Sequence, residues 1–130
     1  MTIATRRVGS IVLTAVLGVS VSADQAPPLQ QLMREKLETS QQILAAVVTS
    51  DWLTLERLSD ELARIANDPA WTVLTTSQYA RYSTSFLRAT EDLGEAARLR
   101  DLETAPVAFV SLTLSCVQCH RYVARARIAD

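Results

Sequence analysis

The chain has 130 residues, of which 48% are hydrophobic and 21% charged, and its 13 basic and 14 acidic side chains give a formal net charge of −1. Such a length is enough for one compact domain and too short for two. Because there is no basic excess, the composition gives no sign of a nucleic-acid-binding protein.

The amino terminus has the pattern of a secretory signal peptide. Arg6 and Arg7 precede an uncharged run from Val8 to Val21, and small residues follow up to Ala23. The run is shorter than the ~18 residues that a membrane-spanning helix needs, so an uncleaved anchor is the weaker alternative. We therefore expect residues 1–23 to be a signal peptide cleaved after Ala23, with residues 24–130 forming a single periplasmic domain. Cleavage removes both arginines and makes the net charge more negative by two.

The first half of this domain predicts two amphipathic helices, because apolar residues recur every three or four positions. The first helix follows Pro28 and carries Leu29, Leu32, Met33, Leu37, Ile43, Leu44, Val47 and Val48. Ser50-Asp51 ends it and caps the second, which Asn67-Asp68-Pro69 ends in turn. The apolar positions of the second helix are Trp52, Leu55, Leu58, Leu62 and Ile65.

The second half predicts two more helices. Thr75, Thr76 or Ser77 can cap the third, whose inward positions are Tyr79, Tyr82, Phe86, Ala89, Leu93, Ala96 and Ala97. The fourth starts at Thr104 and tolerates Pro106 in its first turn, and its apolar positions are Val107, Val110, Leu114 and Val117. No strand-like alternation persists. Four such helices joined by short loops predict an all-α, antiparallel four-helix bundle, a fold that places cofactors in its core.

The only two cysteines and the only histidine of the chain stand together as Cys116-Val117-Gln118-Cys119-His120. The spacing C-x-x-C-H is the attachment signature of c-type haem, in which two thiols add to the vinyl groups and the imidazole binds iron. On a helix, positions i, i+3 and i+4 share a face, so the three side chains can reach one ring. We therefore expect one haem c per chain, attached through Cys116 and Cys119, with His120 as iron ligand near one end of the bundle. The signal peptide agrees with this, because bacterial c-type haem is attached outside the inner membrane.

Other readings of the cysteines fit less well. A structural zinc site needs about four ligands, and the chain has no second cluster of cysteine or histidine. A thioredoxin-like thiol pair lies at a strand-to-helix junction, which the helical pattern does not provide. A disulfide between residues three apart on a helix would close a small strained loop.

The helix order, the turn at Pro69-Ala70-Trp71 and the late C-x-x-C-H motif together resemble bacterial cytochromes of the cytochrome c′ type and their low-spin four-helix relatives. The resemblance implies an exported bundle with the haem on its last helix. Many cytochromes c′ continue the motif as C-H-x-x-Y-[RK], whereas here the two corresponding positions are Val123 and Ala124. Tyr122 and Arg125 are each displaced by one position. The electrostatics that this family places beside the proximal histidine therefore do not carry over directly.

In this family a residue of the first helix decides whether the sixth iron position is filled. Met33, the only methionine of the mature chain, stands near the place of that residue, and a thioether is a common partner of a histidine-ligated haem. We expect His120 and Met33 to ligate the metal. The alternative is an open site lined by Leu32, Met33 or Leu37. Three arginines follow the motif, and they either end a solvated helix or pair with a haem propionate or an acidic redox partner: Arg121, Arg125 and Arg127.

These features predict a periplasmic electron carrier that exchanges single electrons with a redox partner protein. The alternative is a cytochrome c′-like protein that binds gaseous nitric oxide or carbon monoxide at an open sixth position; a third is a subunit of a larger redox assembly. Enzymatic turnover is not expected, because no general acid or base is evident beside the haem. A homodimer also stays open, since Tyr79 and Tyr82, one turn apart, can reach a haem propionate or a second copy, although packing in the core is the favoured interpretation.

Overall fold

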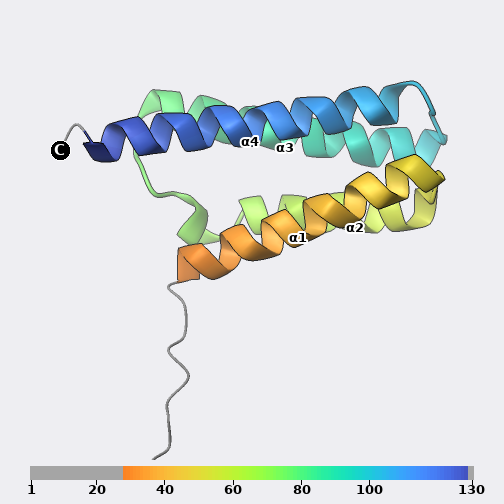
Figure 1. Ribbon diagram of the computed structural model, residues 1–130, viewed down its shortest axis with the longest axis horizontal. Coiled ribbons are helices and arrows are strands. Elements are labelled where there is room, and N and C mark those ends of the chain that lie inside the picture. Colours follow the sequence, from red (N-terminus) through yellow and green to blue (C-terminus); the bar gives the residue numbers. More distant parts are fainter. Residues whose placement is uncertain (1–27, 129–130) are drawn as a thin grey trace, which may run out of the picture.

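The computed structural model describes residues 28–128, with side chains up to residue 126, and it is an all-α four-helix bundle (Figure 1). The helices are α1 (Pro28–Thr49), α2 (Trp52–Ala66), α3 (Ser77–Leu99) and α4 (Thr104–Ile128), and a short 3₁₀ helix, η1 (Pro69–Trp71), follows α2. The prediction of an all-α bundle of four helices is confirmed. The predicted signal peptide lies outside the described residues.

The helix ends follow the capping chemistry of the sequence. The side chain of Asp51 accepts a hydrogen bond from the Thr54 backbone N–H at 3.2 Å, and Thr76 caps α3 by accepting from Tyr79 N–H at 3.2 Å. Before α4, the Asp101 carboxylate accepts from the Thr104 backbone N–H and hydroxyl at 3.0 and 2.6 Å. These caps satisfy backbone donors that have no partner within the helix, and so they set where each helix begins.

Helices that are consecutive in sequence pack against each other, whereas α1 and α4 meet at few points. In Figure 1 these two helices approach each other near the α3–α4 turn and diverge toward the C-terminus of α4. The core between the helices holds fully buried aliphatic and aromatic side chains: Ile43, Leu55, Leu62, Ile65, Phe86, Leu93 and Leu112. None of the described helices is long and apolar enough to cross a membrane.

Part of the expected apolar pattern does not face the core. On α1, the exposed fractions of Leu37, Leu44 and Val48 are 59%, 48% and 75%. The expected apolar positions of α4 are also exposed: Val107, Val110, Leu114 and Val117. The side of α4 that packs in the core carries mostly small residues instead, among them Ala105, Ala108 and Ser115. They face an α3 that is itself rich in buried alanine, and small side chains allow two helices to pack closely.

Core truncation gives a test of this packing. Leu93 on α3 is fully buried, so Leu93→Ala should lower the free energy of unfolding by about 2–5 kcal/mol through lost burial and the cavity left behind. Leu99 on the same helix is 69% exposed, so Leu99→Ala should change the free energy of unfolding by less than about 0.5 kcal/mol. Urea titrations followed by circular dichroism measure both, and equal effects would contradict the assigned core.

Candidate functional site

The candidate site is a cleft between α1 and α4, where the two helices diverge. It consists of two neighbouring cavities of about 260 and 200 Å³, and Met33, Lys36 and His120 line both of them. Leu37, Leu44, Phe109 and Leu112 contribute to the first cavity, and Leu29, Trp71, Val73 and Val123 to the second. Ser40, Gln41 and Thr113 also line the first cavity, and the remaining lining is mainly apolar, as in most small-molecule sites.

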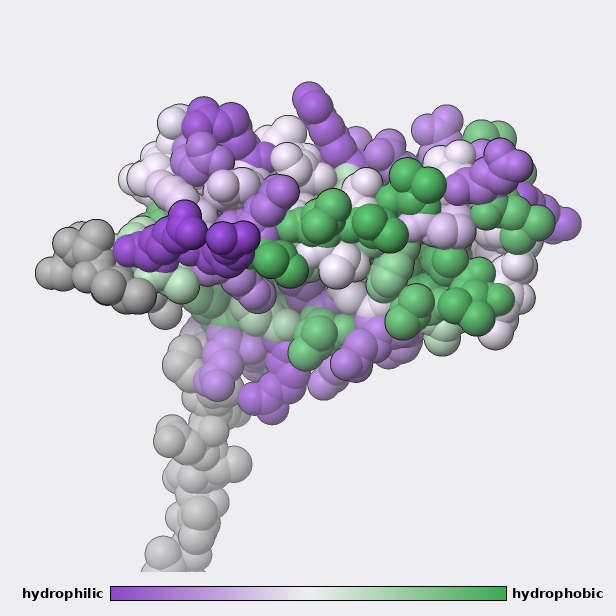
Figure 2. Space-filling view, turned by 45° about the horizontal axis from the view of Figure 1, so that its top comes forward, coloured by the Kyte–Doolittle hydropathy of each residue, from purple (hydrophilic) through white to green (hydrophobic). Residues whose placement is uncertain are grey.

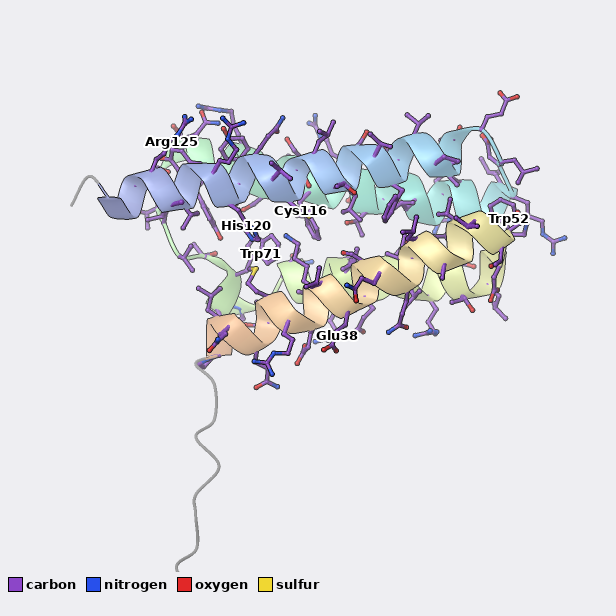
Figure 3. All side chains as sticks on the ribbon, in the orientation of Figure 1. Glu38, Trp52, Trp71, Cys116, His120 and Arg125 are labelled. Atoms are coloured by element: carbon purple, nitrogen blue, oxygen red, sulfur yellow. The ribbon has the colours of Figure 1, made fainter. Side chains whose placement is uncertain are left out.

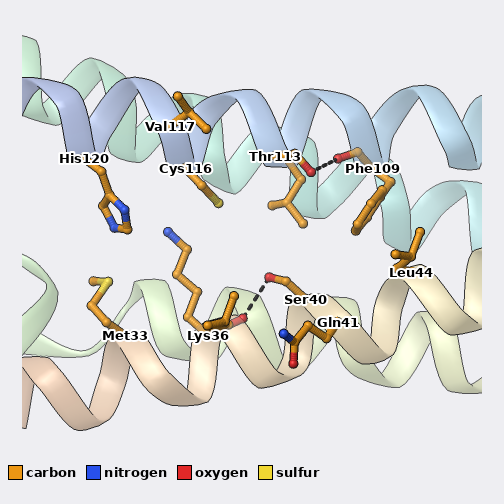
Figure 4. Close-up of a pocket in the computed structure, with 12 residues that line it drawn as sticks. Met33, Lys36, Ser40, Gln41, Leu44, Phe109, Thr113, Cys116, Val117 and His120 are labelled. Atoms are coloured by element: carbon orange, nitrogen blue, oxygen red, sulfur yellow. Dashed lines mark hydrogen bonds between the residues drawn. The ribbon is translucent and has the colours of Figure 1, made fainter.

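The structure brings together all four residues that the sequence analysis selected. Cys116 lines the first cavity and Cys119 the second, while His120 lines both from α4. Met33 lines both from α1, and its side chain lies across the cleft from the His120 imidazole (Figure 4). Both cysteines are free thiols and half-buried. The motif thus presents two thiols and an imidazole to one cleft, opposite a thioether.

Lys36 is a site residue that the sequence analysis missed. It is the only lysine of the chain, its side chain is 6% exposed, and it extends across the cleft toward Cys116 and His120 (Figure 4). Its amino group lies 4.7 Å from the ring centroid of Trp71 and 4.3 Å from that of Phe86, which are cation–π distances. Its position three residues after Met33 was the available signal, since i and i+3 share a helix face.

Aromatic residues from η1 and α3 support the inner wall of the cleft. The rings of Trp71 and Phe86 lie 5.0 Å apart, and the Trp71 indole N–H donates to the Ser83 hydroxyl at 3.0 Å. The Tyr79 hydroxyl donates to the Trp71 carbonyl oxygen. Tyr79 is buried in the core. Its hydrogen bond helps to hold Trp71 beside the site, where Figure 3 shows Trp71 near His120.

The environment of the cleft sets the charge state of its groups. Burial, together with the nearby charge of Lys36, lowers the pKa of His120 and favours the neutral imidazole that binds metals. Burial raises the pKa of the Cys119 thiol. Cys116 is the middle residue of α4 and Cys119 lies in its C-terminal half, so both are far from the helix N-terminus that would stabilise a thiolate. The location does not favour a reactive redox thiol pair.

Apart from Val123, which lines the second cavity, the residues described after the motif do not line the cleft. Arg121 and Arg125 are exposed and line neither cavity, and Figure 3 shows Arg125 directed away from the cleft. The Arg127 side chain lies outside the described residues. The Tyr122 hydroxyl shares a 2.8 Å hydrogen bond with the hydroxyl of Thr76, and its ring lies 5.7 Å from that of Tyr82. Tyr122 therefore joins α4 to α3.

Across residues 28–128, no three histidine, cysteine, aspartate or glutamate side chains are grouped so as to hold a bare metal ion. Comparisons with protein-family models, curated protein sequences and solved structures gave no match.

The buried lysine predicts a pH dependence of stability in the haem-free chain. Burial lowers the pKa of Lys36 from its usual 10.5, so between the lowered value and 10.5 the unfolded chain binds more protons than the folded chain. Lys36 by itself therefore makes the free energy of unfolding rise with pH across this window, whereas the raised pKa values of Cys119 and Tyr79 act in the opposite direction above their usual 9.0 and 10.0. Lys36→Met should remove only the lysine contribution, so the free energy of unfolding of the native chain minus that of Lys36→Met should rise as pH approaches 10.5.

Urea titrations from neutral pH to pH 10.5 measure this dependence. Arg34→Met, which changes an exposed cation two positions away on α1, is the matched control and should follow the pH profile of the native chain. Parallel pH profiles for the native chain and Lys36→Met would contradict the lowered pKa.

Proposed function

We propose that this protein is a c-type cytochrome that carries single electrons through one covalently attached haem. The observation that carries the proposal is the convergence of Cys116, Cys119, His120 and Met33 on one apolar cleft. Two thiols and an imidazole at i, i+3 and i+4 on α4 match the requirement for two thioether bonds and a proximal ligand. A zinc site would need further cysteine or histidine ligands, and a reactive thiol pair would need a nearby helix N-terminus; the cleft provides neither.

The residues of the cleft fit a haem. Small-molecule sites usually enclose about 300–1,000 Å³ with mainly apolar walls and a few polar groups, and the two adjoining cavities together reach this range. The donor set of imidazole and thioether is one that haem iron takes in cytochromes. Cys116 and Cys119 would hold the haem, which would supply one-electron chemistry when bound. Lys36 projects into the same space and would lie against it or move aside.

Electron transfer and gas binding would differ in whether a second side chain, across the cleft from His120, also binds the iron. Met33 lines both cavities on the far side of the cleft, so its sulfur is available as a sixth ligand. A filled sixth position favours the electron carrier over the gas-binding alternative. Of the residues named for an open site, Leu32 packs in the core, whereas Leu37 lines the first cavity. The neutral amine of Lys36 is a second candidate ligand, because Lys36 also lines both cavities.

An absorption spectrum of the purified chain, expressed with a haem-attachment system, tests this function. We expect the sharp α and β bands of a low-spin c-type haem after reduction, retained through extraction with acidified organic solvent. A spectrum without haem, or haem removed by that extraction, would overturn the proposal. A broad high-spin spectrum would keep the haem and favour gas binding.

Attachment of haem c in bacteria requires export, so the proposal includes a periplasmic location. Amino-terminal sequencing of the periplasmic fraction should begin at Asp24, because the small residues up to Ala23 form the cleavage site. Full-length chain in the membrane fraction would instead indicate an uncleaved anchor.

A further inference from the structure

The outward side of α4 carries a row of exposed apolar side chains. Val107, Val110, Leu114 and Val117 follow one another at spacings of three, four and three, and each is between 49% and 65% exposed. The row lies opposite the core side of the helix, which is formed by Ala105, Ala108 and Leu112. Figure 2 shows apolar side chains gathered in a band on this face. A helix that is apolar on two opposite sides normally buries both.

The charges around this row are placed only at its ends. The chain carries no acidic or basic residue between Thr104 and Arg121 other than the motif's His120. Arg121 stands four residues after Val117 on α4, and Glu103, in the turn directly before α4, stands four before Val107, so the two charges mark the two ends of the row. Both side chains are exposed, and the ion pairs among the described residues involve neither. The six positions follow the spacing of a coiled-coil seam over about two and a half heptads.

The row is also symmetric about Leu112. When α4 is turned end for end around this residue, Val107 falls on Val117, Val110 falls on Leu114, and Glu103 falls on Arg121. A two-fold axis makes a surface meet itself, so residue i contacts j and j contacts i. In this arrangement every apolar residue meets an apolar one and each glutamate meets an arginine. A parallel pair would instead place glutamate against glutamate.

We propose that α4 packs antiparallel against α4 of a second copy of this chain, with the two-fold axis at Leu112. Val117, at one end of the seam, also lines the first cavity of the cleft, as do the exposed Leu37 and Leu44 of α1. The interface goes beyond the proposed function and does not depend on it, since Val107, Val110 and Leu114 line neither cavity of the cleft.

Light scattering coupled to size-exclusion chromatography tests the proposal on the chain as isolated. We expect a dimer, and we expect Leu114→Glu to yield a monomer of unchanged helix content, because this side chain is outside the core. Leu53 on α2 is 80% exposed, so Leu53→Glu is the matched control and should stay dimeric. A native chain that is monomeric at every concentration measured would overturn the interface.

A charge exchange identifies the partner as a second copy. Glu103→Arg and Arg121→Glu should each weaken the dimer by about tenfold or more, because each places like charges together twice across the axis. The double variant Glu103→Arg/Arg121→Glu restores opposite charges in both places and should recover the native dissociation constant. If the double variant does not recover the native dissociation constant, the antiparallel register is wrong. If the single variants leave the dissociation constant unchanged, the register is also wrong.

Discussion

Replacing Cys116 and Cys119 together by serine should yield a folded chain that carries no covalent haem. The two sulfur atoms are the only thiols of the protein and they line the two adjoining cavities of one cleft, so no other side chain can form the thioether bonds. Both residues are half-buried, and serine is nearly the same size, so the bundle should keep its helix content. Intact-protein mass after expression with a haem-attachment system should equal that of the bare polypeptide, whereas the native chain should exceed it by one haem.

Gln118→Ala is the matched control, because this residue lies within the motif, is exposed and lines neither cavity. It should retain the full haem mass. His120→Ala separates attachment from ligation, since both thiols remain while the proximal imidazole is lost. A native chain of bare mass would rule out the haem assignment, and a serine double variant that still gains the mass would rule out these attachment points.

Replacing Met33 should change the spin state if its sulfur is the sixth ligand. Histidine and thioether together favour low-spin iron and raise the reduction potential. Met33→Ala should therefore give a high-spin ferric spectrum, a lower potential, and carbon monoxide binding that is faster by roughly tenfold or more. A bond that adds only ~1.4 kcal/mol to the barrier already accounts for that factor. Absorption spectra, a redox titration and flash photolysis measure the three effects.

Met33→Leu is the control that separates ligation from packing, because leucine has a similar volume but no sulfur. If Met33 is a ligand, leucine and alanine should have the same spectroscopic effect. If the amine of Lys36 is the ligand instead, Lys36→Ala should produce the high-spin spectrum and Met33→Leu should not. A native protein that is already high-spin and insensitive to both would favour the gas-binding function.

Local patterns in the sequence determine the helices and the motif. The N-terminal ends of α2, α3 and α4 follow from the capping residues Asp51, Thr76 and Asp101. Each of these side chains accepts a hydrogen bond from a backbone N–H group three residues further along the chain. The grouping of Cys116, Cys119 and His120 is equally local, because helical periodicity alone places them near one another. Short-range geometry of this kind can be read without knowing which helices are neighbours.

Only the tertiary structure decides which apolar side of a helix is buried. α4 has two apolar sides, and the larger valines and leucine suggested the wrong one, because close packing on α3 selects the side with Ala105 and Ala108. The placement of Lys36 also depends on tertiary contacts, since its burial is compensated by Trp71 from η1 and Phe86 from α3. Met33 reaches the cleft opposite His120 only because α1 diverges from α4 there. Periodicity along one helix therefore determined the attachment motif, whereas the packing of separate helices determined what faces it.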